Sequence, residues 1–339
     1  MKIVCVCDYP INELVMAPIK ELTKYGAEVV FLKDEQMQSP KNITEVVRIC
    51  EAKGADASPA NPALVEAGKD ADIIVVHCSP VNTEVLQAAR KLKCVAVLRS
   101  GTENVNEKLC QERGIKIINA PGRSAHAVAD FTVGMMIAEA RNIARGHMGL
   151  MQGKWRKDFV NSFYMHDLRK CTVGIIGAGQ IGQKVIERLK GFGCSIIVHD
   201  PFVPEESVAK LGVPAVSLED LLSQSDFVCL HLRLSEKTEK FIGKEQLDLM
   251  KQTAFLINTA RSGLIDHDAL FHALDDGDIG GAALDVFDVE PLPADFPFLQ
   301  LENVTITPHT AGTSVDTFDN SVEIILDELT NLFEKREFN

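Results

Sequence analysis

The sequence has no long hydrophobic run, and this absence excludes one large class of proteins. A membrane-spanning helix needs about 18 or more consecutive apolar residues, and no stretch of the chain approaches that length. The N-terminal apolar run, Ile3 to Cys7, meets Asp8 at once, so it is too short for a secretory signal peptide. We therefore expect a cytoplasmic protein that does not associate with membranes.

Positive charge is also in short supply. The 339 residues include 35 Lys and Arg against 48 Asp and Glu, which gives a formal net charge of −13. A charge of this sign disfavours non-specific binding to nucleic acid, so we expect no nucleic-acid partner. At roughly 150 residues per domain, the length predicts about two domains. The composition, 46% hydrophobic and 24% charged, is typical of globular chains.

Cysteine motifs are missing as well. The nine cysteines are an odd number, and no CxxC pair or Cys/His cluster has the spacing of a zinc site. Several cysteines lie in apolar runs that resemble strands. We therefore expect reduced, inert thiols and no metal site.

The sequence does contain two series of alternating strands and helices, which predict an α/β fold with parallel sheets. Short runs rich in Val and Ile suit strands buried on both faces. The first series has expected strands at 2–7, 28–32, 72–77, 94–98 and 115–118, with helices near 11–25, 43–53, 82–92 and 106–113. The second has strands at 172–176, 195–199, 226–231, 254–258, 281–285 and 303–306, with helices at 181–190, 218–223 and 266–275. Further helices are expected over 124–144 and 316–333.

The strongest local motif is a GxGxxG turn within residues 173–182, directly after a strand and directly before a helix. Gly177 allows the tight turn, Gly179 leaves room for a pyrophosphate, and Gly182 lets the helix pack close to the strand. The free N–H groups at the start of the helix then face the phosphates. This context predicts a dinucleotide-binding site.

Asp200 indicates which dinucleotide binds. It ends the next expected strand, at about the 20-residue spacing from the motif at which an acidic residue binds the ribose hydroxyls. A 2′-phosphate would place further negative charge beside this carboxylate. The following residues, Pro201 and Phe202, offer no compensating arginine. We therefore predict NAD rather than NADP.

Three ionisable residues in the second half suggest catalysis. Arg261 follows an expected strand, Glu290 precedes Pro291, and His309 follows the last expected strand. Each alone has an ordinary structural explanation. Together, on a dinucleotide-binding sheet, they form a complete set for hydride transfer. Arg261 would orient a 2-oxo or 2-hydroxy acid, His309 would exchange the hydroxyl proton, and Glu290 would orient His309 and favour its protonated form.

These motifs resemble the D-isomer-specific 2-hydroxyacid dehydrogenase family, which includes 3-phosphoglycerate dehydrogenases and glyoxylate/hydroxypyruvate reductases. Residues 173–182, 228–263, 280–291 and 306–312 carry the resemblance. It implies a Rossmann NAD-binding domain, 119–314, inserted into a flavodoxin-like substrate domain, 1–118 plus 315–339, with the active site in the cleft between them. It also implies a homodimer built around the helix near 124–145.

The resemblance also implies roles for individual residues. Arg261, Glu290 and His309 would be the catalytic triad. Thr259, Ala260 and Asp285 would line the nicotinamide side, with Asp285 contacting the carboxamide, and residues 231–233 would lie along the adenosine side. The whole implied cofactor set is Gly177, Gly179, Gln180, Ile181, Gly182, Asp200, His231, Leu232, Arg233, Thr238, Thr259, Ala260, Arg261, Asp285, His309 and Gly312.

On the substrate side, the family's glycine-rich loop matches residues 98–105. Ser100 and Gly101 would bind the substrate carboxylate through backbone N–H groups, whereas Arg99 would either contact an anion or face solvent. The loop 77–80 supplies two further candidates, Cys78 and, as a specificity residue, His77.

Several positions depart from the family pattern. Val76 and His77 stand where many 3-phosphoglycerate dehydrogenases have an Arg-Ser pair, which weakens the case for a phosphorylated substrate. Arg123 is a candidate to reach the cleft, and Arg233 replaces a usual proline. Ser124 and Asp130 replace the usual Asn and Glu.

Two other functions fit the same fold. One is an NAD-sensing scaffold similar to the C-terminal-binding-protein corepressors, which can retain the triad but usually carry extra disordered tails. The other is a formate dehydrogenase, but those enzymes usually have Gln at the position of Glu290. The sequence favours the 2-hydroxyacid dehydrogenase over both.

Overall fold

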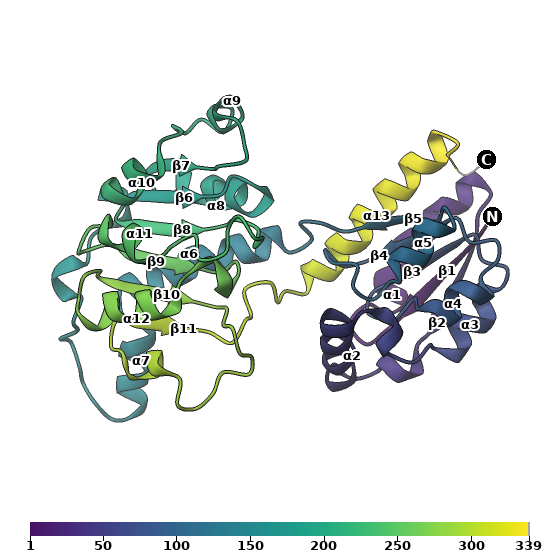
Figure 1. The fold of residues 1–339 in the computed structure, drawn as a ribbon, viewed down its shortest axis with the longest axis horizontal. Coiled ribbons are helices and arrows are strands. Elements are labelled where there is room, and N and C mark those ends of the chain that lie inside the picture. The colour runs from purple at the N-terminus through teal and green to yellow at the C-terminus, as the bar shows by residue number, and fades with distance from the viewer. Residues whose placement is uncertain (338–339) are drawn as a thin grey trace. The chain divides into compact units, whose positions relative to one another are not determined.

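In the computed structural model, which describes residues 1–337, the chain divides into two units. Unit 1 contains residues 1–124 together with the described residues from Ser314 onward, and unit 2 is Ala125–Thr313. Unit 2 is therefore inserted into the sequence of unit 1. Each unit is a parallel sheet flanked by helices (Figure 1), which confirms the predicted α/β fold.

Unit 1 contains a five-stranded sheet with the order β2-β1-β3-β4-β5, in which all neighbouring strands are parallel. The Val- and Ile-rich runs form these strands because helices cover both faces of such a sheet. The strands are β1 (Lys2–Cys7), β2 (Glu28–Lys33), β3 (Ile73–Val76), β4 (Cys94–Val97) and β5 (Lys116–Asn119).

Five of the six α-helices that the structure describes in unit 1 begin at N-cap residues whose side chains accept hydrogen bonds from the first turn, among them Asn12, Asn82 and Asn106, whereas the C-terminal helix has no such cap. The segment 11–25 differs from the single regular helix we predicted. Its α-helical part ends at Met16, and a 3-10 helix that contains Pro18 follows, because proline lacks the N–H that an α-helix needs. The α-helices are α1 (Glu13–Met16), α2 (Pro40–Lys53), α3 (Pro62–Gly68), α4 (Thr83–Ala88), α5 (Glu107–Glu112) and α13 (Asp316–Glu334), and the 3-10 segments are η1 (Ala17–Tyr25), η2 (Glu35–Met37) and η3 (Ala55–Ala57).

Unit 2 contains a six-stranded parallel sheet with the order β11-β10-β9-β8-β6-β7. The first strand of this unit, β6, lies between β7 and β8, so the strand order reverses beside it. In open α/β sheets, ligands bind at the carboxyl ends of the strands at such a reversal. The strands are β6 (Thr172–Ile176), β7 (Ser195–His199), β8 (Phe227–Leu230), β9 (Phe255–Asn258), β10 (Gly281–Leu284) and β11 (Val304–Ile306).

The prediction of one helix over 124–144 is wrong. The segment forms two helices, α6 and α7, and Asn142 between them adopts a left-handed conformation with φ of 54°. Its buried side chain donates a hydrogen bond to Asn161 Oδ1 at 2.5 Å, which holds the break in place. The helices of unit 2 are α6 (Ala125–Ala140), α7 (Ile143–Met151), α8 (Gln180–Lys190), α9 (Glu205–Ala209), α10 (Leu218–Gln224), α11 (Lys244–Asp248) and α12 (His267–Asp275), with 3-10 segments η4 (Ser162–Tyr164), η5 (Leu168–Lys170), η6 (Ser262–Leu264) and η7 (Pro297–Gln300).

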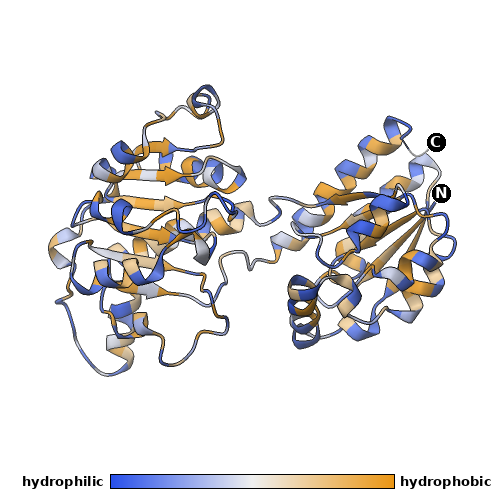
Figure 2. Ribbon diagram, viewed as in Figure 1, coloured by the Kyte–Doolittle hydropathy of each residue, from blue (hydrophilic) through white to orange (hydrophobic). Residues whose placement is uncertain are grey.

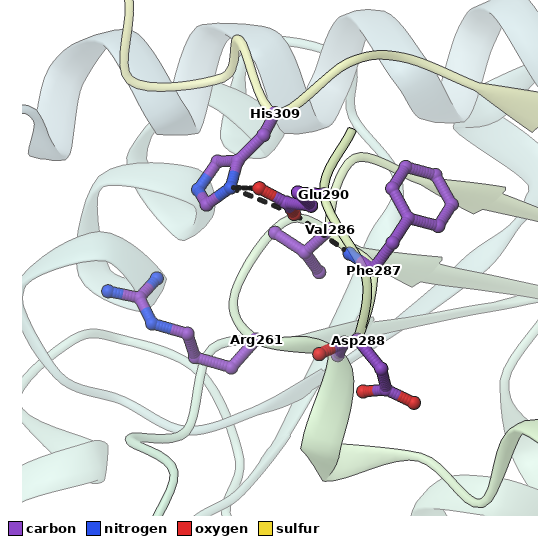
Figure 3. Close-up of a pocket in the computed structure, with 7 residues that line it drawn as sticks. Arg261, Val286, Phe287, Asp288, Glu290 and His309 are labelled. Atoms are coloured by element: carbon purple, nitrogen blue, oxygen red, sulfur yellow. Dashed lines mark hydrogen bonds and ion pairs between the residues drawn. The ribbon is translucent and has the colours of Figure 1, made fainter. Parts of the chain in front are cut away.

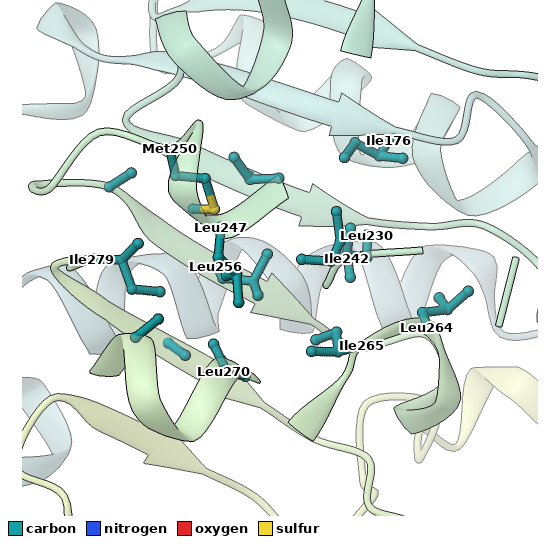
Figure 4. Packing of buried hydrophobic residues seen from close by; sticks show 14 of the residues in the cluster. Ile176, Leu230, Ile242, Leu247, Met250, Leu256, Leu264, Ile265, Leu270 and Ile279 are labelled. Atoms are coloured by element: carbon teal, nitrogen blue, oxygen red, sulfur yellow. The ribbon is translucent and has the colours of Figure 1, made fainter. Parts of the chain in front are cut away.

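Each sheet has one apolar core on either face, as the orange strands in Figure 2 indicate. Alternate residues of one strand belong to different cores, since successive side chains point to opposite faces. In β9, Leu256 lies in one core and Phe255 and Ile257 in the other. Figure 4 shows the first of these cores, where Leu256 packs among Leu230, Ile242 and Leu270. Burying such a side chain fully contributes roughly 1.5–3 kcal/mol.

A buried ionic network joins α6 to the last strand of unit 2. The carboxylate of Glu139, which has no exposed surface, accepts two hydrogen bonds from Arg145 at 2.7 Å and one from Thr305 Oγ1 at 2.6 Å. Burial raises the pKa of the Glu139 carboxyl, and Arg145 and Thr305 oppose that shift. The network therefore depends on both partners to hold a buried charge.

We expect Thr305→Val to lower the stability of unit 2 by about 1–3 kcal/mol, because it keeps the side-chain volume but removes one of the two hydrogen bonds that the buried Glu139 Oε2 accepts. Differential scanning calorimetry measures this as a lower Tm. Thr313→Val, at an exposed position in the same unit, is the matched control. Equal Tm values for the two variants would contradict a stabilising role for this hydrogen bond.

All nine cysteines are unpaired, and all but Cys194 are buried. Burial raises the pKa of the Cys110 thiol to about 11, so that group is neutral at physiological pH. Among residues 1–337, no helix is both long and apolar enough to cross a membrane.

Candidate active site

The glycine-rich turn lies between β6 and α8, beside the reversal of strand order in unit 2. Gly177 has a φ of 103°, and a Cβ there would lie 2.7 Å from the carbonyl carbon of His231. A Cβ on Gly182 would collide with the carbonyl group of Gly177. A side chain at Gly179, by contrast, would project into open space, which is where a pyrophosphate needs room. The three glycines thus meet the requirements that we derived for them.

Asp200 follows β7 and faces this turn. Its Oδ2 accepts a hydrogen bond from the Ala178 N–H at 2.6 Å, while Oδ1 accepts from the N–H groups of Phe202 and Val203 at 2.8 and 3.0 Å. The carboxylate is therefore fixed beside the phosphate-binding turn, as expected for a group that binds a ribose. Gln180 and Ile181 begin α8, where their backbone N–H groups belong to the free helix N-terminus.

His231 lies across the same reversal, directly after β8. Its N–H donates to the Ile176 carbonyl at 2.8 Å, and neither ring nitrogen has a partner among the described residues. Burial lowers the pKa of His231 to about 4, so the ring is neutral. Buried polar atoms without partners are uncommon in folded proteins and indicate that a polar ligand completes this edge of the sheet.

The other implied adenosine-side residues have different environments. Leu232 is buried and Arg233 is exposed. Thr238 is buried, and its hydroxyl donates to the Arg233 carbonyl at 2.7 Å and accepts from the Ser235 N–H at 2.8 Å. Thr238 therefore closes the turn that carries Arg233.

Arg261 is positioned by Asn258, the last residue of β9. The Asn258 side chain accepts from the Ala260 N–H at 3.0 Å and donates to the Arg261 carbonyl at 2.9 Å, which fixes the turn between them. The Arg261 side chain is exposed, and its Nη1 donates to the Ala260 carbonyl at 2.6 Å. Thr259 is buried and shares a 2.7 Å hydrogen bond with Thr132. Our sequence analysis missed the role of Asn258.

His309 and Glu290 form the pair that we predicted. His309 Nδ1 lies 2.8 and 3.0 Å from the two Glu290 oxygens, and Glu290 Oε1 also accepts from the Phe287 N–H at 3.0 Å. Because a carboxylate only accepts, Nδ1 carries the proton that it donates, and Nε2 is left for other chemistry. His309 has a φ of 52°, a conformation that is uncommon for a residue other than glycine. Such outliers cluster at functional sites.

Asp285 holds the loop that carries His309. Its carboxylate, which has no exposed surface, accepts hydrogen bonds from Thr307 Oγ1 at 2.6 Å and from the N–H groups of Thr310 and Ala311 at 3.0 and 2.8 Å. Gly312 follows in the same turn. The observed bonds make Asp285 an anchor for residues 307–311, and its predicted contact with the cofactor stays a prediction.

Arg261, Glu290 and His309 line one open pocket of about 310 Å³ in unit 2, together with Ser262, Val286, Phe287 and Asp288. Figure 3 shows the Arg261 guanidinium and the His309 ring projecting to the same side of this pocket. The Arg261 guanidinium, which can bind an anion, and the His309 imidazole therefore share one solvent-accessible site. This arrangement suits proton exchange on a bound acid.

The predicted substrate residues of unit 1 gather at the carboxyl ends of β3 and β4. His77 and Cys78 are buried, so their side chains are not on the surface. Ser100 Oγ donates to the Ala120 carbonyl at 3.2 Å, and Arg99 Nη2 donates to Glu51 Oε1 at 2.8 Å. The Glu103 carboxylate folds over Gly101, in the space that a side chain at position 101 would occupy.

Comparison with known proteins shows similarity over nearly the whole chain. The family model described as D-isomer specific 2-hydroxyacid dehydrogenase, NAD binding domain, matches residues 133–311. A glyoxylate reductase of Korarchaeum cryptofilum is 40% identical over 81% of this chain and 83% of its own length. A D-3-phosphoglycerate dehydrogenase of Methanocaldococcus jannaschii is 41% identical over 78% of this chain, but the match covers only 50% of that protein.

The fold is likewise similar to that of a solved structure. The NAD-complexed D-isomer specific 2-hydroxyacid dehydrogenase of Lactobacillus delbrueckii ssp. bulgaricus aligns with a TM-score of 0.76 and 25% identity, over 99% of this chain and 98% of that one. This similarity and the family model confirm a Rossmann NAD-binding domain and NAD as the cofactor.

Proposed function

The chain belongs to the D-isomer-specific 2-hydroxyacid dehydrogenase family, and from this premise we propose which of its residues carry out the reaction. The protein is an NAD-dependent oxidoreductase that interconverts a D-2-hydroxy acid and its 2-oxo acid. One observation supports the assignment of roles above all others. The Glu290–His309 hydrogen bond of 2.8 Å and the exposed guanidinium of Arg261 belong to the same pocket.

The mechanism follows from the chemistry of these three residues. Bound NAD supplies the hydride chemistry at the carbon that carries the oxygen. Arg261 binds the substrate carboxylate and stabilises the negative charge that develops on the oxygen. His309 donates a proton to that oxygen during reduction and removes it during oxidation, through Nε2. Glu290 accepts the Nδ1 proton, which orients the ring and stabilises its protonated form.

Unit 1 supplies the remaining substrate contacts in this proposal. The backbone N–H groups of Ser100 and Gly101 bind the substrate carboxylate in this proposal, which requires the Glu103 carboxylate to move from its position over Gly101. Unit 1 is therefore the substrate domain, and unit 2 binds the cofactor. The phosphate-binding turn, with Asp200 fixed beside it, and the unpaired ring of His231 support the assignment of unit 2.

Measuring NADH oxidation at 340 nm tests this proposal. The substrates are glyoxylate, hydroxypyruvate, pyruvate, 2-oxoglutarate, phosphohydroxypyruvate and a four-carbon sugar-acid ketone. We expect turnover of at least one acid and its loss in the His309→Ala variant. NADH binding without turnover of any acid would contradict the proposal and favour an NAD-sensing scaffold.

Asp200 determines the choice of cofactor in this proposal. Its carboxylate would repel a 2′-phosphate, so we expect the protein to prefer NADH to NADPH. Asp200→Ser should raise KM for NADH by about 10–100-fold, since it removes charge-assisted hydrogen bonds to the ribose. The ratio of kcat/KM with NADPH to kcat/KM with NADH should be higher in this variant than in the wild type. Asp278→Ser, an exposed change in the same unit, is the control. A wild-type protein that used NADPH tenfold better than NADH would overturn the assignment.

We also propose that the protein is a cytoplasmic homodimer. Large apolar side chains are exposed on and after α7, including Met151, Trp155 and Phe163 at 75%, 78% and 93% exposure. Several exposed large apolar side chains on one segment of the chain are unfavourable in water, and burial against a second copy of the chain would remove that cost. The unpaired cysteines are typical of a reducing compartment. Sedimentation equilibrium should give twice the mass of the chain, and Phe163→Glu should shift the protein towards monomer.

A further inference from the structure

A second cluster of polar side chains lies in unit 1, where the strand order also reverses. Asp8 follows β1 and His77 follows β3, and these two strands are neighbours at that reversal. Arg99 follows the next strand, β4. The carboxyl ends of parallel strands meet at one edge of the sheet, so the three residues share the place where ligands bind in open α/β sheets. Arg123 completes the cluster, with its Nη1 atom 3.4 Å from His77 Nε2 and 3.1 Å from the Leu98 carbonyl oxygen.

Asp8 and His77 orient Arg123. His77 Nδ1 lies 2.8 Å from Asp8 Oδ2, and both side chains are almost completely buried. A guanidinium only donates, so His77 Nε2 must accept from Arg123, and the ring proton must lie on Nδ1 and be donated to Asp8. Burial lowers the pKa of His77, which agrees with a neutral ring. Asp8 therefore fixes the tautomer of His77, and that tautomer presents an acceptor to Arg123.

The two guanidinium groups have donors without acceptors. Arg99 Nη1 is buried and has no hydrogen-bond partner among the described residues, although Nη2 binds Glu51. In Arg123, every bond found within residues 1–337 involves Nη1, so its Nε and Nη2 atoms have none. Arg123 Nη1 donates to the carbonyl of Leu98, the residue directly before Arg99, so the Arg123 guanidinium lies against the backbone that carries Arg99. Burial and the charge of Arg99 both lower the pKa of Arg123. An acceptor with negative charge would satisfy both.

The same cluster includes three groups that could bind a metal ion, and the surroundings disfavour that alternative. The ligand atoms of Asp8, His77 and Cys78 lie within 4.8 Å of one another. Binding through Cys78 requires a thiolate, but burial raises the pKa of that thiol to about 12. Two neighbouring guanidinium groups would also repel a cation. The Asp8 carboxylate is already paired with His77 and that of Glu51 with Arg99, so the groups of this cluster still without a partner among the described residues are guanidinium donors, which favour an anion at this position.

We propose that Arg99 and Arg123 bind a second anionic group of the substrate, either a carboxylate or a phosphate, and that Asp8 and His77 position Arg123. This inference rests on the proposed function, in which Ser100 and Gly101 bind the carboxylate next to the reacting carbon. Because Ser100 and Gly101 directly follow Arg99, a carboxylate bound at that loop lies next to the residue that carries the first guanidinium group. The substrate is thus a 2-hydroxy acid with two anionic groups, and forked guanidinium donors match either group bidentately.

Steady-state kinetics with paired 2-oxo acids test this proposal. Hydroxypyruvate has one anionic group, oxaloacetate and 2-oxoglutarate have a second carboxylate, and phosphohydroxypyruvate has a phosphate. We expect the wild type to have a higher kcat/KM for one of the dianionic acids than for hydroxypyruvate. Arg123→Gln should raise KM for that acid by about 10–100-fold, with kcat and the hydroxypyruvate reaction nearly unchanged. Which dianionic acid responds identifies the second group.

Two further comparisons separate binding from folding. Arg90→Gln removes the same charge from an exposed position in unit 1 and should change neither KM. His77→Leu should raise KM for the dianionic acid, whereas His77→Gln, which can still donate to Asp8 and accept from Arg123, should retain most of the affinity. Calorimetry shows whether each variant folds. An Arg123→Gln variant that lost both substrates equally, or a wild type that reduced only monoanionic acids, would overturn the proposal.

A binding measurement distinguishes failure of this inference from failure of the proposed function. Inorganic phosphate and malonate should raise the Tm of the wild-type protein, and the increase should disappear in Arg123→Gln but not in Arg90→Gln. That result without turnover of any 2-oxo acid would retain the anion site and contradict the proposed reaction. Turnover of a 2-oxo acid without any effect of dianions on Tm or KM would support the proposed reaction and contradict the anion site. Stabilisation by Zn²⁺ that is lost in Cys78→Ser would assign the cluster to a metal and overturn the anion site.

Discussion

Replacing His309 with Gln is expected to lower kcat for reduction of the 2-oxo acid by about 10²–10⁴-fold, the usual contribution of a general acid–base group. The amide retains much of the side-chain volume and can still hydrogen-bond to Glu290, but it cannot transfer a proton at Nε2. NADH affinity should change only modestly, because the phosphate-binding turn and Asp200 are intact. Stopped-flow consumption of NADH measures the first quantity, and isothermal titration measures the second.

His166→Gln is the matched control. His166 is exposed in the same unit, and its side chain makes no hydrogen bond with any other described residue. It should leave kcat unchanged. If His309→Gln kept more than about a tenth of the wild-type kcat, His309 would not be the proton donor, since the expected loss is at least about 10². If it lost NADH binding to the same extent as kcat, the residue would act on the cofactor instead.

The parts of the fold that could be predicted are those with a strong local signal. The strands of both sheets were found because β3, β4, β8 and β9 are buried at every position, and burial on both faces requires uninterrupted apolar runs. The break between α6 and α7 was missed because it depends on the hydrogen bond from Asn142 to Asn161, a residue outside both helices. The spacing of apolar residues along a helix carries no information about such a contact.

The residues of the candidate site likewise differ in whether the sequence predicts them. The glycine-rich turn and Asp200 have a recognisable spacing, so both can be predicted from the sequence alone. The anchoring role of Asp285 was missed, because its partners Thr307, Thr310 and Ala311 follow more than twenty residues later and only the fold brings them together. The orientation of Arg123 by His77 was missed for the same reason, although both residues were singled out as departures from the family pattern.

Arg261 is expected to be as important as His309, but in a different way. Arg261→Gln removes a charged fork that binds the carboxylate and a cation that stabilises the developing oxygen charge. The first loss should raise KM for the 2-oxo acid and the second should lower kcat by about 10²–10³, so kcat/KM should fall by at least about 10³. Arg261→Lys should recover part of kcat but little of KM, because an ammonium supplies charge without the fork.

Within residues 1–337, the side chain of Arg261 makes one hydrogen bond, to the neighbouring Ala260 carbonyl, and the turn is fixed by Asn258. The substitution should therefore leave Tm unchanged, and Arg169→Gln, at an exposed position in the same unit, should have no kinetic effect. An unchanged KM in Arg261→Gln would remove Arg261 from carboxylate binding. Because Asn258 acts only through the turn, Asn258→Ala should reproduce the kinetic loss more weakly, and it should also lower Tm. That difference separates the residue that contacts the substrate from the residue that positions it.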